Sequence, residues 1–202
     1  KACSINHLDL WIRQGIPAYQ ITLPHIAGCD MAGVVEEIGP GVTEVQPGAA
    51  VLVSPGLSCF QCDWCQAGHD NLCASYGIMG AKTDGGYAEF AKARAGDLVP
   101  IPAGITFEEA AAFPLVFLTA WHMLMTRAQL KAGETVLIHA AGRGVGHAAI
   151  QIAKLAGATV YTTVGSDAKV EKARVLGADA VINYQQEDFV ARVQDLTRRR
   201  GV

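Results

Sequence analysis

Four cysteines lie close together in the segment 59–73, which reads CFQCDWCQAGHDNLC. They are separated by two, two and seven residues, and short C-x-x-C steps let thiolates converge on one ion from a tight loop. Four thiolates complete a tetrahedral shell and leave no coordination position open for a substrate. The spacing predicts one structural zinc ion per subunit, with these ligands: Cys59, Cys62, Cys65 and Cys73.

Disulfides and free core cysteines are the alternative interpretations of these thiols. The first residues, KACSINHLDLW, contain neither the apolar stretch nor the cleavage site of a signal peptide. Together with the uneven cysteine spacing, this favours a reducing cytoplasm, where disulfides are rare. Free core cysteines seldom cluster in a polar loop. We therefore expect a cytoplasmic protein with a zinc site.

A glycine-rich turn, HAAGRGVGHAAIQ, forms the second motif with chemical potential. The pattern predicts a strand over 134–140, a turn over 141–146 and a helix over 147–156. Such a turn lets the backbone approach a pyrophosphate, which the N–H groups of the helix N-terminus then bind. The predicted dinucleotide-binding residues here are Gly142, Arg143, Gly144, Val145 and Gly146.

The glycine spacing departs from G-x-G-x-x-G, because Ala141 and Arg143 stand where glycine is expected. A merely structural turn is the alternative to a dinucleotide site. Arg143 lies against phosphate in one interpretation and points to solvent in the other. The strand before the turn and the helix after it are the context that favours dinucleotide binding.

The next predicted strand, TVYTTVG, has no acidic residue at its carboxyl end. An acid there would accept the ribose 2′-hydroxyl and repel a 2′-phosphate. Gly165, Ser166 and Lys169 follow instead, and Asp167 is expected in the first turn of the next helix. This pattern favours NADP(H) over NAD(H). A capping role for Ser166 and a solvated Lys169 are compatible with the same residues.

The two halves of the chain differ in composition and in predicted secondary structure. Residues 1 to about 100 contain short β-prone runs between Gly and Pro turns, which indicates a barrel-like or irregular β region. From about 105 on, Thr106 and Glu109 predict a capping box, and Pro114 is expected to break that helix. Alternating strands and helices then predict the start of a doubly wound parallel sheet. We place the domains at 1–104 and 105–202.

Composition limits the classes of function. The chain has 202 residues, of which 50% are hydrophobic and 17% charged, with a net charge of −3. It can bury a sizeable core, and it has neither a basic stripe for nucleic acid nor an apolar membrane span. A small-molecule substrate is therefore the expected partner. The chain begins without Met and stops where a further strand is expected, so we expect part of a longer protein.

Several motifs together resemble the medium-chain dehydrogenase/reductase superfamily, specifically zinc-type alcohol dehydrogenases and their quinone reductase relatives. Besides the four-cysteine lobe they are NHLDLWIRQG, PHIAGCDMAGVVEEIGPGV, DGGYAEF, AAFPLVFLTAW, AAGRGVG and GADAVINY, and they extend over essentially the whole chain. The resemblance implies a GroES-like β-barrel catalytic domain, followed by a Rossmann domain of which only the first half is present. It also implies a homodimer or homotetramer.

Zinc alcohol dehydrogenases hold a second, catalytic zinc between Cys, His and Cys. The matching positions here are Asn6, Cys29 and Leu115, so only one ligand-type side chain remains. These substitutions resemble the zinc-independent quinone reductase branch. By that resemblance Asn6 donates a hydrogen bond to the substrate oxygen and Thr119 lies near the nicotinamide.

The resemblance assigns two further residues to the cofactor. Tyr184 would lie near the adenosine end, and His7 near the pyrophosphate. A solvated or packed loop histidine is the alternative for His7.

The expected function is that of an NADP(H)-dependent oxidoreductase that transfers hydride to or from a small quinone, enone or carbonyl/alcohol. A structural zinc and no evident catalytic zinc belong to this expectation. A zinc-dependent alcohol dehydrogenase is the alternative within the family. A nucleotide-binding structural or trafficking protein with little turnover is the alternative of another class.

Overall fold

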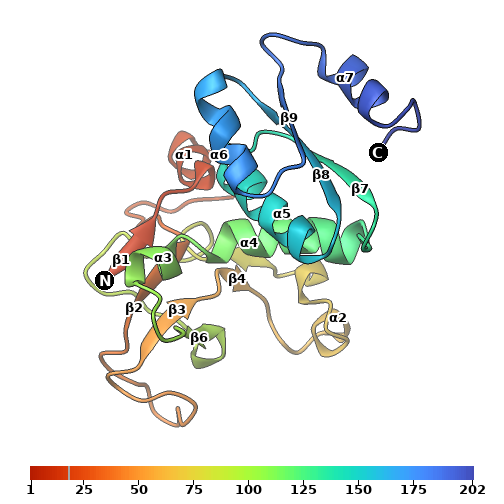
Figure 1. The fold of residues 1–202 in the computed structure, drawn as a ribbon. Helices are drawn as coiled ribbons and strands as arrows, with labels where there is room; N and C mark the ends of the chain where they lie inside the picture. The colour runs from red at the N-terminus through yellow and green to blue at the C-terminus, as the bar shows by residue number, and fades with distance from the viewer. Residues whose placement is uncertain (18) are drawn as a thin grey trace. The chain divides into compact units, whose positions relative to one another are not determined.

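The structure, a computed structural model, describes residues 1–17 and 19–202. It divides into two compact units, Lys1–Leu115 and Val116–Val202, and each is described by itself below (Figure 1). Within the described residues no helix combines the length and the apolar character that a membrane crossing requires.

An antiparallel sheet forms the centre of the first unit, with the strand order β1-β2-β3-β6. Its strands are β1 (Ala2–Ser4), β2 (Asp30–Val34), β3 (Ala50–Val53) and β6 (Leu98–Pro100). Met31, Val53 and Met79 are buried together in one apolar cluster of this unit. The β texture predicted for the first hundred residues is confirmed.

The helix α1 (His7–Gln14) follows β1 directly. Its start is fixed by Asp9, whose carboxylate accepts a hydrogen bond of 2.7 Å from the backbone N–H of Asn6. Because Ser4 pairs with Asp30 across β1 and β2, the start of α1 lies beside the start of β2. The motifs NHLD and GCD, more than twenty residues apart in the sequence, therefore meet at one end of the sheet.

The cysteine lobe is closed by a short antiparallel pair, β4 (Gly56–Leu57) with β5 (Gly77–Ile78). Between these strands the chain forms α2 (Asp63–Gln66) and the 3-10 helix η1 (Asp70–Leu72). The lobe is coloured yellow in Figure 1. Pairing of the two strands brings the first and last cysteines of the segment close together.

The capping box predicted at Thr106 is confirmed. Its hydroxyl accepts from the backbone N–H of Glu109 at 3.2 Å, while the Glu109 carboxylate accepts from the Thr106 N–H at 2.9 Å. The helix α3 (Phe107–Ala111) then ends, and α4 (Pro114–Trp121) begins at the proline. Pro114 breaks the helix as predicted and occupies the first position of the next one, where its missing N–H costs nothing. Two short turns complete these regions, namely η2 (Ala95–Asp97) and the π-helical η3 (His122–Arg127).

The second unit is an alternation of strands and helices with a parallel sheet in the order β7-β8-β9. The strands are β7 (Thr135–Ile138), β8 (Thr159–Val164) and β9 (Ala180–Asn183). The helices are α5 (Gly144–Leu155), η4 (Asp167–Lys169), α6 (Val170–Val175) and α7 (Phe189–Leu196). The predicted beginning of a doubly wound parallel sheet is confirmed. The helix expected over 147–156 begins three residues earlier, at Gly144.

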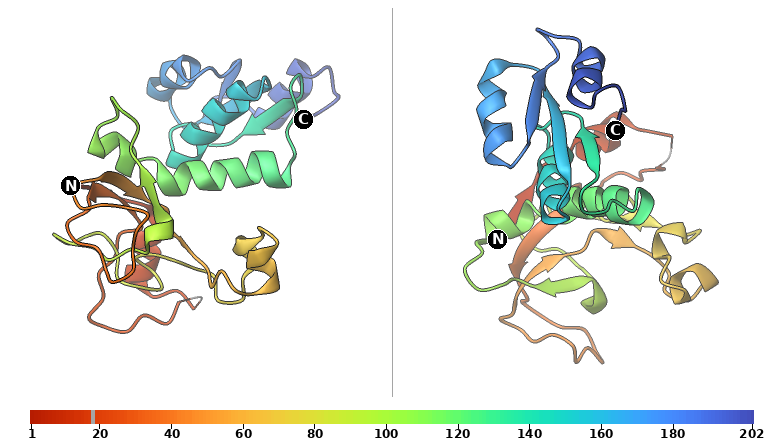
Figure 2. Two further views of the ribbon diagram at one scale, coloured as in Figure 1. Left: turned by 90° about the horizontal axis from the view of Figure 1, so that it is seen from below. Right: turned by 45° about the vertical axis from the view of Figure 1, so that its right-hand side comes forward.

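Residues of α5, α6 and the strands share one core in this unit. Ile150 of α5, Val160 of β8 and Ala173 of α6 belong to the same buried cluster. The helix α7 lies apart from α5 and α6 (Figure 2), and its first residue, Phe189, contacts the ring of His139 edge-on at 5.2 Å. This core fixes the β7–α5 turn against the sheet.

Candidate functional site

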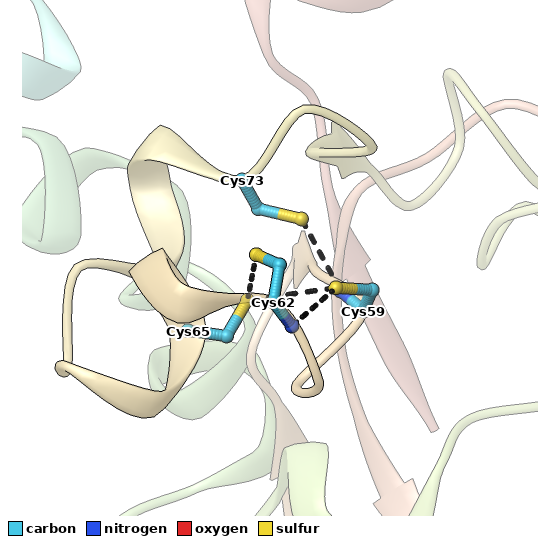
Figure 3. Close-up of side chains that lie close together, drawn as sticks. All are labelled: Cys59, Cys62, Cys65 and Cys73. Carbon is cyan, nitrogen blue, oxygen red and sulfur yellow. Dashed lines mark hydrogen bonds between the residues drawn. The ribbon is translucent and has the colours of Figure 1, made fainter.

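The four cysteine sulfurs of the lobe converge on one point (Figure 3). All lie within 4.8 Å of one another, with Sγ–Sγ distances of 3.9 Å for Cys59–Cys65 and 3.5 Å for Cys62–Cys65. A tetrahedron with Zn–S bonds of about 2.3 Å has sulfur–sulfur edges of about 3.8 Å. A disulfide needs about 2.05 Å, so the thiols have the spacing of metal ligands. No other group of three or more metal-ligating side chains occurs within 1–17 and 19–202.

Local backbone structure brings these thiols together. Cys62 is the residue before α2 and Cys65 lies within it, so one helical turn places both side chains on the same face. Cys73 follows η1 directly, and its sulfur lies 3.5 Å from the backbone N–H of Cys59. The sequence spacing predicted this convergence because each step is local.

Arg94 anchors the lobe, and no local pattern in the sequence predicts this role. Its guanidinium donates to the backbone carbonyl of Ser58 at 2.7 Å and pairs with the buried Asp97 at 2.7 Å. It also lies over the ring of Phe60, 4.5 Å from the centroid. Arg94 therefore connects Ser58, the residue before the first cysteine, to Asp97 of η2.

A second polar cluster surrounds Asn6 in the first unit. The Asn6 side-chain amide donates to Asp30 Oδ2 at 2.8 Å and contacts Cys29 Sγ at 3.4 Å. The backbone N–H of Leu115 donates to Asp30 Oδ1 at 2.9 Å. The three positions matched to catalytic-zinc ligands thus gather around Asp30, although they come from segments far apart in the sequence, with Leu115 lying 85 residues after Asp30.

Asp30 is fully buried and accepts three hydrogen bonds. The donors are the Asn6 amide, the Leu115 N–H and the Ser4 hydroxyl, the last at 3.2 Å. Burial raises the pKa of this carboxyl, and the three donors oppose the rise. The carboxylate is therefore held by neutral donors rather than by a cation.

Cys29 lies in the same cluster with 0% of its surface exposed. Burial and the neighbouring Asp30 raise the pKa of its thiol to about 12. We therefore expect Cys29 to stay protonated at neutral pH, and its alkylation by iodoacetamide to be negligible at pH 7 and to rise steeply with pH. Peptide mass spectrometry measures the labelling rate, with Cys3, whose pKa is raised by burial to about 11, as the internal comparison. Rapid labelling of Cys29 at pH 7 contradicts this environment.

Asp9 and Tyr87 join this cluster to a groove. The Tyr87 hydroxyl donates to Asp9 Oδ2 at 2.7 Å, and burial, then the hydrogen bond to Asp9, raises the pKa of Tyr87. Asp9 Oδ1 is buried and has no hydrogen-bond partner among the described residues. Both residues line a groove of about 760 Å³, together with Arg13, His25 and several aliphatic side chains. The first unit thus places an unsatisfied carboxylate oxygen beside an open space.

The glycine turn of the second unit is tightly packed at its start and end. Ala140 has a positive φ of 60°, and its N–H donates to the Thr163 hydroxyl at 3.1 Å. A Cβ at Gly146 would lie 2.3 Å from the carbonyl oxygen of Ala140. Only glycine permits this close approach of α5 to the end of β7, which is the third-glycine role in a dinucleotide turn. Val145, also predicted to bind the cofactor, is half-buried in the first turn of α5.

The other predicted cofactor residues of the second unit lie at the same edge of the sheet. The Lys169 side chain packs on Gly142, with Cδ 3.1 Å from the position of a Cβ there. The Tyr184 hydroxyl lies 2.6 Å from the Cβ position of Gly165. Ser166 precedes η4 without a side-chain cap, so its hydroxyl does not have the capping role of the alternative interpretation.

Asp167, the first acidic residue after β8, is engaged by two side-chain amides of the second unit. Its carboxylate accepts from the side-chain amides of Asn183 at 2.8 Å and Gln186 at 2.7 Å. It lies in the first turn of η4, as predicted. Asn183 ends β9, and no sequence signal identified it as the partner that holds this acid.

His7 and Thr119 lie in different units. His7 is exposed at the start of α1, and its ring contacts Trp11 edge-on at 4.9 Å. Thr119 is half-buried in α4, in the second unit.

Two protein-family models match parts of this chain. Residues 1–103, more than half of it, match the model "Alcohol dehydrogenase GroES-like domain". The chain belongs to the medium-chain dehydrogenase/reductase superfamily. Residues 144–202 match "Zinc-binding dehydrogenase". The predicted architecture, a GroES-like domain followed by the start of a Rossmann sheet, is confirmed, and this member belongs to a superfamily of oxidoreductases.

Individual relatives in the superfamily fall into two groups. An alcohol dehydrogenase of Geobacillus stearothermophilus is 40% identical over 190 residues, covering 93% of this chain and 56% of the relative. A quinone oxidoreductase of Rattus norvegicus is 30% identical over 201 residues, covering 100% of this chain and 53% of the relative. The chain thus spans about half the length of these curated relatives.

Two solved structures illustrate the similarity in three dimensions. An NAD-dependent alcohol dehydrogenase has a TM-score of 0.94 and 47% identity, with 99% of this chain and 58% of that chain covered. A cobalt- and zinc-bound thermostable alcohol dehydrogenase from Pyrobaculum aerophilum has a TM-score of 0.81 and 41% identity, covering 89% and 54%.

Proposed function

We propose that the chain belongs to an NADP(H)-dependent oxidoreductase that transfers hydride to or from a small quinone, enone or carbonyl/alcohol. The observation that carries the proposal is the turn between β7 and α5. A Cβ at Gly146 would lie 2.3 Å from the Ala140 carbonyl oxygen, so only glycine lets α5 begin this close to β7. The N-terminus of α5 remains open to a ligand, because Gly144 lines a hollow. Backbone N–H groups of Gly142, Gly144, Val145 and Gly146 would hold the pyrophosphate there. The bound cofactor supplies or accepts the hydride, and this chain's residues bind and orient it.

A structural zinc in the lobe is the second part of the proposal. The sulfur spacing of the four thiols fits a tetrahedral ion, and four thiolates leave no position for a substrate. The ion would supply stability to the segment 59–73 and take no part in the reaction.

Hydride transfer without a second zinc is the third part, and it rests on the donor set around Asn6. An amide, one thiol and a carboxylate already engaged by three donors make a poor zinc site. One N–H of the Asn6 amide donates to Asp30 at 2.8 Å, whereas its contact of 3.4 Å with Cys29 Sγ is weak. The same amide nitrogen lies 3.5 Å from the Ser4 hydroxyl, so its second N–H has only long contacts to give up when it donates to a developing enolate oxygen. Thr119 near the nicotinamide and His7 near the pyrophosphate complete the proposed site.

The preference for NADP(H) over NAD(H) rests on the residues after β8. At this edge of the sheet, Ser166 has a hydroxyl without a capping hydrogen bond, Lys169 has an ammonium group and Tyr184 has a hydroxyl. The Asp167 carboxylate accepts a hydrogen bond from the side-chain amide of Asn183. The rival is NAD(H), because one similar solved structure is titled NAD-dependent. An acid free to accept the ribose 2′-hydroxyl would favour that rival, and Asp167 is engaged elsewhere.

The remaining proposals concern the whole protein. We propose domains at 1–104 and 105–202, a homodimer or homotetramer, a small-molecule substrate and a cytoplasmic location. They follow from the sequence texture, the superfamily and the cysteine chemistry.

Two other functions remain as candidates. A zinc-dependent alcohol dehydrogenase is favoured by the relatives named alcohol dehydrogenase, one of them solved with cobalt and zinc. A nucleotide-binding protein with little turnover is compatible with the open α5 N-terminus alone.

Metal analysis combined with turnover assays separates the three. We expect about one zinc per subunit and NADPH oxidation with a panel of quinones and enones. Two zinc ions per subunit and alcohol oxidation that stops when one is removed would establish the alcohol dehydrogenase. Tight NADPH binding without turnover on either panel would establish the third candidate.

A further inference from the structure

A hollow of about 540 Å³ opens beside the glycine turn in the second unit. It is lined on one side by Gly142, Arg143 and Gly144 and on the other by Lys169 and Lys172. The side chain of Lys169 lies across the two sides, because its Cδ packs on Gly142. The hollow therefore lies between the turn, where a pyrophosphate would bind, and the helices η4 and α6, which follow the carboxyl end of β8.

Three cationic side chains of this hollow have no carboxylate partner in the part of the chain that the structure describes. Arg143, Lys169 and Lys172 form no ion pair with any carboxylate in the described part of the chain. The one acid that lines the same hollow, Glu171, pairs with Arg174 at 3.5 Å. Three cationic side chains thus line one open space, together with the one carboxylate of Glu171. Their mutual repulsion falls when an anion enters, which is the electrostatic condition for an anion site.

Arg143 has the backbone geometry to serve this site. It is the residue before α5, its N–H donates to Ala140 at 2.9 Å, and its carbonyl accepts from His147 at 2.8 Å. Its backbone is therefore occupied in the turn, and its guanidinium remains for a ligand. A guanidinium holds a phosphate by two parallel N–H donors, whereas an ammonium acts as a point charge.

Asp167 is the acidic residue near this edge of the sheet that would repel a phosphate, and other side chains engage its carboxylate. Asp167 is held by Asn183 and Gln186, and it is absent from the lining of the hollow. Ser166, directly before it, is half-buried without a capping bond. The Asp167 carboxylate is thus directed to the two amides and does not line the hollow.

We propose that Arg143 and Lys172 join Lys169 in binding the 2′-phosphate of NADP(H), and that Arg143 determines the preference for NADP(H) over NAD(H). The inference rests on the proposed function, because it presupposes that a dinucleotide occupies the glycine turn. It goes beyond that function in assigning the third residue of a glycine turn, and a lysine on α6, to the 2′-phosphate. Pyrophosphate is the competing ligand for Arg143.

Isothermal titration calorimetry of the full-length protein with three nucleotides tests the proposal. The compound 2′,5′-ADP carries the 2′-phosphate without a pyrophosphate, ADP carries the pyrophosphate without a 2′-phosphate, and 5′-AMP carries neither. We expect Arg143→Ser to weaken 2′,5′-ADP at least about tenfold and ADP by less than about threefold. Lys172→Glu, on the exposed side of α6, is expected to weaken 2′,5′-ADP likewise.

The control is Arg192→Ser, which removes an arginine of the same unit that pairs with Glu187 at 3.8 Å outside the hollow. It is expected to leave all three affinities unchanged. Serine at 143 is a favourable residue before a helix, and a thermal midpoint equal to that of the parent protein shows that the variant folds.

Each contrary outcome has a distinct meaning. If the parent protein binds 2′,5′-ADP no more tightly than 5′-AMP, the NADP(H) preference itself is wrong and this inference falls with it. If the parent shows that preference but Arg143→Ser retains it, the preference stands and the role of Arg143 is wrong. If Arg143→Ser weakens ADP instead, Arg143 serves the pyrophosphate and the inference is overturned.

Discussion

Gly146→Ala is expected to destabilise the second unit by about 3 kcal/mol and to abolish measurable dinucleotide binding. The added Cβ would lie 2.3 Å from the Ala140 carbonyl oxygen and 3.0 Å from that of His139. Both contacts are to backbone, so no side-chain rotation relieves them, and either α5 or the end of β7 must shift. Such a shift displaces the N–H groups that would hold the pyrophosphate. Thermal unfolding and titration with NADPH measure the two effects.

Gly142→Ala is the matched control, since it makes the same change in the same turn. Its Cβ would meet only the flexible end of Lys169, at 3.1 Å, and Gly142 lacks a positive φ. We expect its thermal midpoint to stay close to that of the parent protein. If Gly146→Ala has an unchanged midpoint and binds NADPH normally, the close packing of α5 on β7 does not support a dinucleotide turn.

Cys65→Ser is expected to remove the metal ion and loosen the lobe. Its sulfur lies within 3.9 Å of both Cys59 and Cys62, so its loss opens one corner of the tetrahedron. A hydroxyl is a far weaker zinc ligand than a thiolate, and we expect zinc affinity to fall at least about 100-fold. Metal analysis should show zinc falling from about one ion per subunit to near zero. Limited proteolysis should then cut within 59–73, because much of the order in this segment depends on the ion.

Cys3→Ser makes the same chemical change in the same unit, outside the cluster. It should retain the zinc ion and the protease resistance of the lobe. A Cys65→Ser protein that keeps one zinc would show that Cys65 is not needed to hold the ion. A Cys65→Ser protein that loses the zinc and still resists cleavage would show that the lobe is held by Arg94 and the β4–β5 pair rather than by metal.

Several helix boundaries of the chain were predictable because their signals are local. Thr106 and Glu109 are three residues apart and form the predicted capping box. Pro114 could be predicted to interrupt the helix because a proline ring is incompatible with a helix interior. The start of α5 was placed three residues late, since the flexible glycines at its N-terminus resemble a loop in sequence.

The cluster around Asn6 was only partly predictable. The positions Asn6, Cys29 and Leu115 followed from the resemblance, but the role of Asp30 as their common partner did not. A hydrogen bond between Leu115 and Asp30 joins residues 85 apart in the sequence, and no local pattern predicts such a contact. Likewise the bond between Tyr87 and Asp9 depends on how the segments of the first unit fold together.

Spacing of neighbouring residues was sufficient to identify the superfamily, the cluster of four thiols and the glycine turn, because each is a local pattern. Tertiary structure alone decided which polar groups are engaged and which remain available. It satisfied Asp30 with three neutral donors and turned Asp167 toward Asn183. It also gathered Arg143, Lys169 and Lys172 around one hollow. These outcomes depend on the pairing of distant strands and the packing of helices on them, which fix the directions of side chains that local spacing leaves open.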